Sequence, residues 1–420
     1  MDLTEFLAAE WRLALGCTEP AAVAYAASLA AEQGGGEPHM IQLLLDARTY
    51  KNCHAVGLPN SDGKTGLLWA LSLGAQVKDA SLGLQIFSAV TPEVRLAAAR
   101  LLERGAVHVE VDGDQEELLV DCTVACSGGV GRAVLEKEHT RLVRLEANGL
   151  KAPGFLDPQH GETVAGVRDR IGALSLQELV ALAKTLSEAD RQRLREGLAL
   201  NLAMAEAGER HLPPQFVPGA GNPLIRIPRR VAAGVLGRMS GEALPVMSLA
   251  GSGNKGITVS VALGLWARDQ GAPEARMEEA LALACLLTTA TTHRLGTLSA
   301  ICGSANAAGI GLAVGLVHLA GGTQAQMELA IHTMVGNLAG MVCDGAKIGC
   351  AMKSMTGVEA AFRSAELALS GFGIPETDGI VGRDGAASLA NLGRLAQRGM
   401  VGVDAEILDI MQAKLRTPKA

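Results

Sequence analysis

The order of hydrophobic and polar positions predicts that the first part of the chain mixes helices with strands. Some segments repeat apolar residues at helical spacing, whereas others alternate apolar and polar residues as half-buried strands do. Helices are expected over residues 2–15, 19–33, 64–73 and 92–104, and strands over residues 41–45, 107–111, 118–126, 131–136 and 141–146. Thr18 is expected to cap the second helix, and a polar, turn-rich loop is expected over residues 50–66.

The rest of the chain has an almost continuous helical pattern. Helices are expected across residues 175–207 and 224–372, with two short helices between residues 374 and 411. A Gly/Pro-containing linker, residues 153–163, separates the two patterns. We therefore predict an α+β fold with two domains. Residues 1–165 form a mixed domain of helices, strands and substrate-contact loops, and residues 166–420 form a mainly helical, Gly/Ala-rich catalytic domain.

Two apolar stretches in the helical part resemble membrane spans at first sight. Residues 257–266 are too short to cross a bilayer, and residues 300–320 are interrupted by glycines and polar side chains. Both are expected to be buried helices, and no membrane association is expected. The chain holds 51 glycines, and 48% of its residues are hydrophobic, so closely packed helices and a homodimer are expected.

Charge and termini narrow the function further. The net charge is −7, and the chain has no basic run or basic patch interleaved with aromatic residues, so nucleic-acid binding is not expected. The N-terminus is acidic and lacks the basic flank and apolar stretch of a signal peptide. A cytoplasmic enzyme acting on a small molecule is the resulting expectation, with cysteines available for metal binding or catalysis.

Three of the eight cysteines stand in Gly-rich surroundings of the helical part: Cys302, Cys343 and Cys350. Thiolates are soft ligands suited to iron–sulfur clusters, which usually take four of them. Three ligands would leave one iron open to act as a Lewis acid. The alternative is three ordinary buried cysteines. Cys122 and Cys126 would lie about 13 Å apart on one strand, so we interpret them, like Cys285, as core residues.

A second candidate is the Gly-rich turn from Gly251 to Gly256, immediately before a predicted helix. Free backbone N–H groups at a helix N-terminus attract anions, so this turn is expected to bind a substrate carboxylate or a phosphate. Ser252, Gly253 and Asn254 are the predicted substrate-binding residues. Lys255 offers a pyridoxal-phosphate Schiff base as a rival mechanism, and a simple helix cap is the structural alternative.

Polar residues near two other segments complete the candidate set. Cys17 lies at a helix junction that is expected to lower its thiol pKa, which makes it a candidate acid/base group or an extra cluster contact, with a buried small residue as the alternative. Lys51, Asn52 and His54 follow a predicted strand, where substrate contacts often occur. We predict Cys17, Lys51 and His54 as catalytic candidates and Asn52 as a substrate contact. For Lys51, Asn52 and His54, the alternative role is hydrogen bonding to the loop backbone.

Several of these strings together resemble a known family. The strings are Gly16-Cys-Thr-Glu-Pro-Ala-Ala-Val-Ala-Tyr25, Tyr50-Lys-Asn52, Gly57-Leu-Pro59, Gly251-Ser-Gly-Asn254, Cys302-Gly303 and Cys343-Asp-Gly-Ala-Lys347. They resemble the L-cysteine desulfidase family, which is related to the α subunit of iron–sulfur L-serine dehydratases. The match runs over nearly the full length of the chain.

The resemblance implies an oxygen-sensitive [4Fe–4S] enzyme, free of pyridoxal phosphate, that removes a β-substituent from an amino acid. The cluster would be held by Cys302, Cys343 and Cys350. L-Cysteine would yield pyruvate, ammonia and hydrogen sulfide, and a soft iron–sulfur centre suits this thiolate leaving group. L-Serine, yielding pyruvate and ammonia, is the alternative substrate. A pyridoxal-phosphate lyase using Lys255 and a non-enzymatic iron–sulfur sensor are the remaining alternatives.

Overall fold

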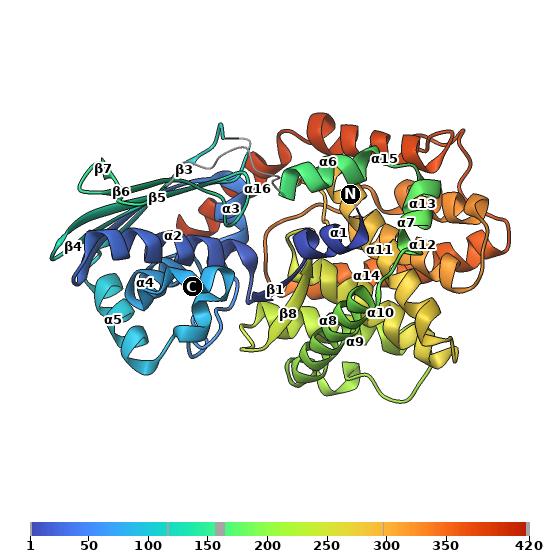
Figure 1. Ribbon diagram of the computed structural model, residues 1–420, viewed down its shortest axis with the longest axis horizontal. Coiled ribbons are helices and arrows are strands. Elements are labelled where there is room, and N and C mark those ends of the chain that lie inside the picture. The colour runs from blue at the N-terminus through green and yellow to red at the C-terminus, as the bar shows by residue number, and fades with distance from the viewer. Residues whose placement is uncertain (1, 116, 156–163, 297, 417–420) are drawn as a thin grey trace.

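A sheet backed by helices and a larger helical body lie side by side in the protein (Figure 1). The computed structural model describes residues 2–115, 117–155, 164–296 and 298–416. Strands are concentrated in the first 151 residues, and nearly all later elements are helices. The predicted α+β fold class is confirmed.

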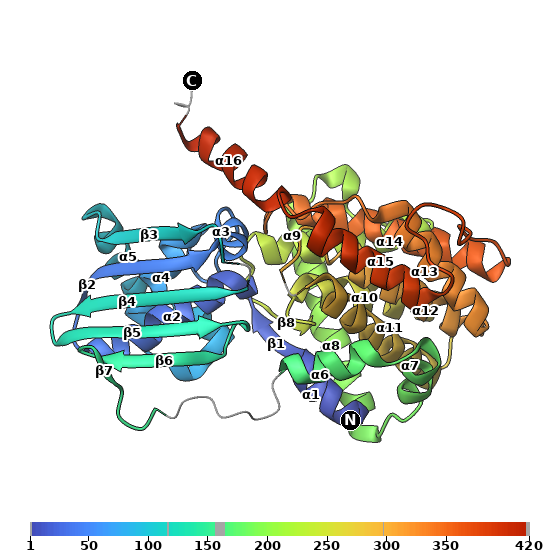
Figure 2. The ribbon, with the colours of Figure 1, turned by 90° about the horizontal axis from the view of Figure 1, so that it is seen from above.

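The sheet has six strands in the order β3-β2-β4-β5-β6-β7, and only β2 and β3 run parallel to each other. The strands are β2 (Pro38–Asp46), β3 (Val107–Asp112), β4 (Leu119–Cys126), β5 (Gly129–Glu136), β6 (Leu142–Ala147) and β7 (Leu150–Lys151). Figure 2 shows them spread in front of the helices that cover one face. Val120, Cys122 and Val124 alternate with less buried residues along β4, which confirms the predicted alternation.

The helices of this part largely confirm the sequence pattern. They are α2 (Thr18–Gly34), α3 (Ala47–Cys53), α4 (Leu67–Val77) and α5 (Pro92–Glu103), with a 3₁₀ segment η1 (Ala80–Ala89) between the last two. Two details differ. Cys17, not Thr18, is the N-cap of α2, and the predicted loop over residues 50–66 begins inside α3. Asp46 caps α3 by accepting a hydrogen bond from the Thr49 amide at 2.8 Å.

The helix predicted over residues 2–15 is wrong in its second half. Helix α1 (Leu3–Glu10) ends at a strand, β1 (Trp11–Leu15), which pairs antiparallel with β8 (Pro245–Leu249). The Trp11 ring is fully buried, and a side chain at Gly197 would come within 2.4 Å of its indole nitrogen. The pairing partner of this strand is more than 200 residues away, so a local pattern cannot indicate it.

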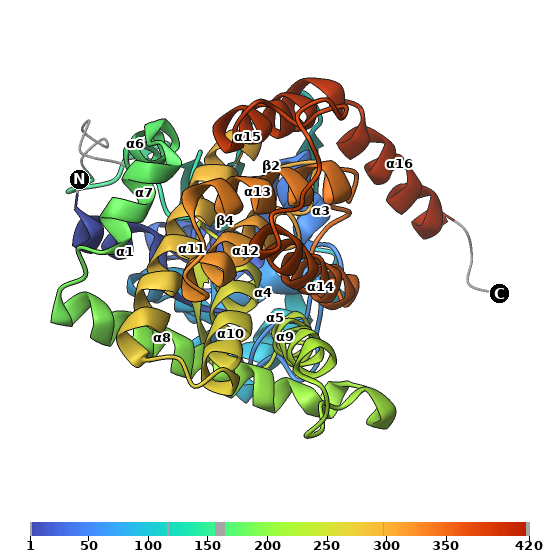
Figure 3. The same cartoon turned by 90° about the vertical axis from the view of Figure 1, so that its right-hand side faces the viewer.

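The helical body confirms the long helical pattern after residue 224, except for strand β8. Its helices are α6 (Val164–Ala173), α7 (Leu176–Ala183), α8 (Glu188–Ala207), α9 (Pro223–Met239), α10 (Gly253–Asp269), α11 (Glu274–Leu295), α12 (Ala307–Leu319), α13 (Gln324–Leu338), α14 (Gly349–Leu369), α15 (Gly385–Arg394) and α16 (Val403–Arg416). Short 3₁₀ segments η2 (Gly208–His211) and η3 (Pro214–Phe216) and a π segment η4 (Leu395–Gly399) join some of them. Figure 3 shows α12 surrounded by neighbouring helices.

Burial within this body agrees with the sequence analysis. Helix α10, which contains residues 257–266, and helix α12, which contains most of the stretch 300–320, are buried along almost their whole length, whereas residues 300–306 precede α12 and are not helical. Among the described residues, no helix combines the length and the apolar character needed to cross a membrane. Cys122, Cys126 and Cys285 are core residues, as predicted.

The two ends of the chain connect the sheet with the helical body. Leu3, Phe6 and Trp11 belong to the hydrophobic core of the helical body, together with Val56. At the other end, α16 packs against α3. The linker predicted over residues 153–163 falls mostly outside the described residues, and the division into two domains near residue 165 stays a prediction.

Candidate active site

A cavity at the junction of the sheet part and the helical body collects most of the predicted site residues. Its walls come from the start of α2, from α3, from the turn before α10, and from the segments that precede α12 and α14. The predicted residues that line it are Cys17, Lys51, Asn52, Ser252, Asn254, Cys302, Cys343 and Cys350. Glu19, His139, Arg238 and Lys255 line it as well.

Backbone pairing brings two of the three cysteines together. Ile301 and Val342 form an isolated antiparallel bridge. Next to it, the Cys302 amide donates to the Met341 carbonyl at 2.9 Å, and the Cys343 amide donates to the Ala300 carbonyl at 2.7 Å. Cysteines 41 positions apart therefore sit on paired backbone segments.

Cys350 joins them from the first turn of α14, which begins at Gly349. Burial, together with the neighbouring Cys302 and Cys343, raises the pKa of the Cys350 thiol to about 12. Burial and Cys302 also raise the pKa of Cys343, which Lys51 opposes. These electrostatic effects indicate that the three thiols lie close to one another, as a shared cofactor requires.

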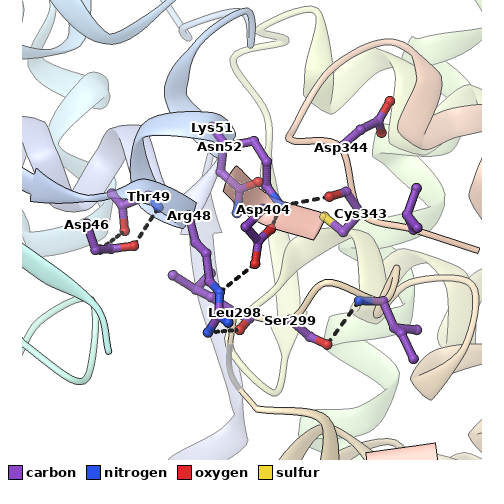
Figure 4. A network of polar contacts seen from close by, with 12 residues as sticks. Asp46, Arg48, Thr49, Lys51, Asn52, Leu298, Ser299, Cys343, Asp344 and Asp404 are labelled. Carbon is purple, nitrogen blue, oxygen red and sulfur yellow. Dashed lines mark hydrogen bonds and ion pairs between the residues drawn. The ribbon is translucent and has the colours of Figure 1, made fainter. Parts of the chain in front are cut away.

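Gly345 lets the cysteine loop approach helix α3. Its φ is +100°, and a side chain there would meet the Lys51 carbonyl oxygen at 2.4 Å. The Lys51 ammonium donates to the Cys343 carbonyl at 2.7 Å and pairs with Asp404 of α16 (Figure 4). Arg48 donates to the other Asp404 oxygen at 2.8 Å. Asp404 thereby connects the C-terminal helix to the loop that carries Cys343.

Replacing Asp404 by asparagine should destabilise the protein by about 3 kcal/mol, because it leaves the buried Lys51 ammonium without its carboxylate partner. The free energy of unfolding in urea measures this effect. Asp409→Asn, at an exposed position of the same helix, is the matched control and should change stability little. Equal stability of the two variants would contradict a structural role for Asp404.

The same contact predicts a pH dependence of stability. Burial alone would raise the pKa of Asp404, but Lys51 and Arg48 outweigh it and hold that pKa below its usual value. A lowered carboxyl pKa stabilises the fold above the ordinary value of about 4, and this contribution disappears as the pH falls through the lowered value. The difference in stability between wild type and Asp404→Asn should therefore be constant near neutral pH and shrink below about pH 4.

The Gly-rich turn leads directly into α10, as predicted. Ser252 is the N-cap residue, and Asn254 and Lys255 lie in the first turn, all facing the cavity. Gly253 does not line the cavity. It lies behind the Arg238 guanidinium, where a side chain would come within 2.3 Å of the Arg238 Nε atom.

Cys17 and Asn52 surround a buried carboxylate that the sequence analysis did not single out. The Cys17 thiol donates to Glu19 Oε2 at 3.0 Å, and Asn52 Nδ2 donates to Glu19 Oε1 at 3.0 Å. Burial and the Glu19 charge raise the pKa of Cys17 well above its ordinary value. This is the opposite of the shift expected from a helix N-terminus, because the adjacent carboxylate and the loss of solvent disfavour a thiolate.

Lys255 and His139 add two nitrogen groups to the cavity wall. Lys255 Nζ donates to the Ala250 carbonyl at 3.1 Å, and a side chain at Gly303 would meet Lys255 Cε at 2.8 Å. Burial and the nearby Arg168 lower the pKa of Lys255 to about 7. Burial also lowers the pKa of His139, an effect that the Glu19 carboxylate opposes.

Comparison with known proteins identifies the family. Residues 83–409 match the family described as serine dehydratase alpha chain. The chain belongs to this family. It is also 37% identical to a UPF0597 protein of Nitratidesulfovibrio vulgaris, covering 98% of this chain and 99% of that protein. UPF0597 proteins of Geobacter sulfurreducens and Desulfotalea psychrophila are each 35% identical, with 96% of both chains covered.

Membership of the serine dehydratase alpha chain family confirms the resemblance to the α subunit of serine dehydratases and indicates a lyase-type enzyme. The matched residues contain Cys302, Cys343 and Cys350, and also Arg238 and Lys255. Cys17 and Glu19 precede the matched region.

Only two of the three predicted catalytic residues of this serine dehydratase alpha chain family member line the cavity. Cys17 and Lys51 line it, whereas His54 does not. The Lys51 ammonium is bound by Asp404 and by the Cys343 carbonyl, and these contacts indicate a structural role.

Sequence reasoning missed Glu19, His139 and Arg238. Of the three, only Glu19 could have been singled out from the sequence, because it belongs to the Gly-Cys-Thr-Glu-Pro string that carries the family resemblance. His139 follows strand β5, and Arg238 lies in the last turn of helix α9, where a basic residue is ordinary. Only their burial beside the other residues distinguishes them.

Proposed function

We propose that this protein is a lyase that carries out β-elimination on a small L-amino acid, with a [4Fe–4S] cluster and without pyridoxal phosphate. Cys302, Cys343 and Cys350 would hold the cluster. The observation that supports it most is the convergence of these three thiols on one cavity with the turn before α10. L-Cysteine is the proposed substrate, giving pyruvate, ammonia and hydrogen sulfide. L-Serine is the second candidate, favoured by the family to which the chain belongs.

The donor set fits a cluster better than a single ion. Within the described ranges, no three His, Cys, Asp or Glu groups converge closely enough to hold one metal ion. A cubane cluster is larger than an ion, so its three cysteines need not meet at a point. When bound, the cluster supplies a Lewis-acidic iron for the departing β-substituent. Cys17 is a fourth cysteine on the cavity wall, but its thiol donates to Glu19.

Lys255 is the proposed base, in preference to Cys17, Lys51 and His54. Its amine faces the cavity between the turn before α10 and the Cys302-Gly303 segment. A pKa of about 7 leaves much of this amine neutral at physiological pH, as a general base requires. Cys17 has a raised pKa, and Lys51 is paired with Asp404.

The proton balance of the reaction is simple. Lys255 accepts the Cα proton, the Cα electron pair forms the Cα–Cβ double bond, and the Cβ–S bond breaks with its electron pair on sulfur. The aminoacrylate product tautomerises to an imine, which water hydrolyses to pyruvate and ammonia. His139 and Asn52 border the same space and help to limit access of bulk water to it.

An anaerobic assay of the full-length protein with L-cysteine and L-serine in parallel tests this function. Pyruvate is measured with both substrates, and sulfide with L-cysteine. We expect equal amounts of pyruvate and sulfide from L-cysteine, and a higher kcat/KM than for L-serine. Faster pyruvate release from L-serine would establish the second candidate. Release from neither amino acid, with a full cluster present, would favour an iron–sulfur sensor.

The quaternary structure and cellular location belong to the same proposal. We propose a cytoplasmic homodimer, supported by the many small-residue helices of the helical body. Light scattering after size-exclusion chromatography under anaerobic conditions measures the mass of the assembly. A mass near 43.3 kDa would contradict the dimer.

A further inference from the structure

Arg238 is a buried cation with unused hydrogen-bond donors. The side chain extends from the last turns of α9 into the cavity wall, and the residue is only 1% exposed. Its Nη1 atom donates to Asn254 Oδ1 at 2.8 Å. Among the described residues, Nε and Nη2 have no hydrogen-bond partner. A buried guanidinium with two unpaired donors is costly, unless a ligand satisfies them.

The surroundings of Arg238 hold its guanidinium in one orientation. Gly253 has no side chain, so the Arg238 Nε atom lies directly against the backbone at the start of α10. Asn254, the next residue, fixes the Nη1 end. A guanidinium that is fixed on one side presents its remaining N–H groups as a rigid fork, the geometry that binds a carboxylate through two parallel hydrogen bonds.

Glu19 supplies the opposite charge on the same cavity. Thr18 and Cys17 both donate to its Oε2 atom at 3.0 Å, and Asn52 donates to Oε1. Burial alone would raise the pKa of Glu19, but His139, the Cys17 thiol and Arg238 outweigh it and hold that pKa below its usual value. Glu19 is therefore an anion, held in place by three donors.

Arg238 and Glu19 face a common space without neutralising each other. Arg238 helps to lower the pKa of Glu19, yet no ion pair between the two side chains occurs in the described part of the chain. Two opposite buried charges that do not pair with each other are complementary to the two opposite charges of a free amino acid. An α-carboxylate and an α-ammonium are joined through one carbon atom, so such a ligand can bridge the two side chains.

We propose that Arg238 and Glu19 together recognise the zwitterion of a free α-amino acid, with Arg238 binding the carboxylate and Glu19 the ammonium group. This assignment rests on the proposed function and deepens it, because it names the residues that bind the two charged groups of the amino acid. It transfers the principal carboxylate contact from the turn before α10 to Arg238, and it gives Asn254 the role of positioning that guanidinium. Acids without an amino group and amines without a carboxylate should bind weakly.

Calorimetric titration of the anaerobically prepared full-length protein with L-alanine tests the proposal. L-Alanine keeps both charged groups but has no leaving group, so it is not consumed. Propionate lacks the ammonium group and serves as the comparison ligand. Wild type should bind L-alanine at least about tenfold more tightly than propionate, since a hydrogen-bonded charge contributes this much or more.

Variants separate the two roles. Arg238→Met should weaken binding of both ligands by roughly 10- to 100-fold, whereas Glu19→Gln should weaken L-alanine and spare propionate. Arg238→Lys keeps the charge without the fork and should bind with intermediate affinity, which guards against misfolding of the methionine variant. Arg229→Met is the matched control, because Arg229 lies on the same helix over the Phe216 ring, outside the cavity.

Failure of the recognition site and failure of the lyase function give different results in the binding and pyruvate-release experiments. Unchanged L-alanine binding in both Arg238 variants, or no preference of wild type for L-alanine over propionate, would overturn the assignment. Failure to release pyruvate, with L-alanine binding that depends on Arg238 and Glu19, would remove the lyase reaction and leave the recognition site in place.

Discussion

Replacing Cys302, Cys343 or Cys350 by serine will remove iron and lyase activity together. Serine has nearly the same shape as cysteine but is a poor ligand for iron, so the fold should persist while the cluster is lost. Elimination should fall by a factor on the order of 10³ or more, because the leaving group loses its electrophilic partner. Iron and acid-labile sulfide content, the broad visible absorbance of anaerobically purified protein, and pyruvate release measure the three consequences.

Two further cysteines provide controls for this experiment. Cys285→Ala alters a fully buried cysteine in the core of α11 and should leave iron content unchanged. Cys17→Ser alters the fourth cysteine of the cavity and should also retain the cluster, since that thiol donates to Glu19. Full iron and activity in a variant of Cys302, Cys343 or Cys350 would remove that residue from the site.

Replacing Lys255 by methionine will abolish elimination while leaving the cluster intact. Loss of a general base typically costs about 10²- to 10⁴-fold in rate, and methionine fills a similar volume without accepting a proton. The visible absorbance should match that of wild type, and kcat should account for most of the loss. Lys184→Met, at an exposed position after α7, is the control.

The outcome at Lys255 also discriminates between mechanisms. A sharp, borohydride-sensitive absorbance band in wild type, absent from Lys255→Met, would indicate a pyridoxal-phosphate aldimine. Normal elimination by Lys255→Met would falsify its role as base and direct attention to His139, which lines the same cavity and whose ring Nε2 atom has no hydrogen-bond partner among the described residues.

Local sequence pattern predicted most of the elements around the site but failed at one strand pair. Strands β2, β3 and β4 alternate more and less buried positions over most of their length, and helix α2 follows a glycine, so these elements leave a local signature. Residues 11–15 carry apolar side chains that fit either a helix or a strand. Their pairing with residues 245–249 decides the conformation, and these two segments are more than 200 residues apart in the sequence.

The candidate site was predictable where residue type carried the chemistry. Cys302, Cys343 and Cys350 stood out because cysteines among glycines in a helical region are unusual. Glu19 and Arg238 did not stand out, since an acidic residue in a first helical turn and a basic residue near a last turn are ordinary. Their importance comes from burial, which removes solvent and makes each unpaired donor or charge significant.

The sequence by itself determined the fold class, the buried helices and the set of thiols that a cluster would need. These properties depend on residue type and on periodicity over a few turns. The tertiary structure alone decided which side chains share the cavity, that Lys51 is held by Asp404, and that Arg238 keeps two donors free of partners within the described residues. The physical reason is that the energy of a buried charge depends on its neighbours in space, and local periodicity does not indicate these neighbours: Asp404, for example, is 353 positions from Lys51.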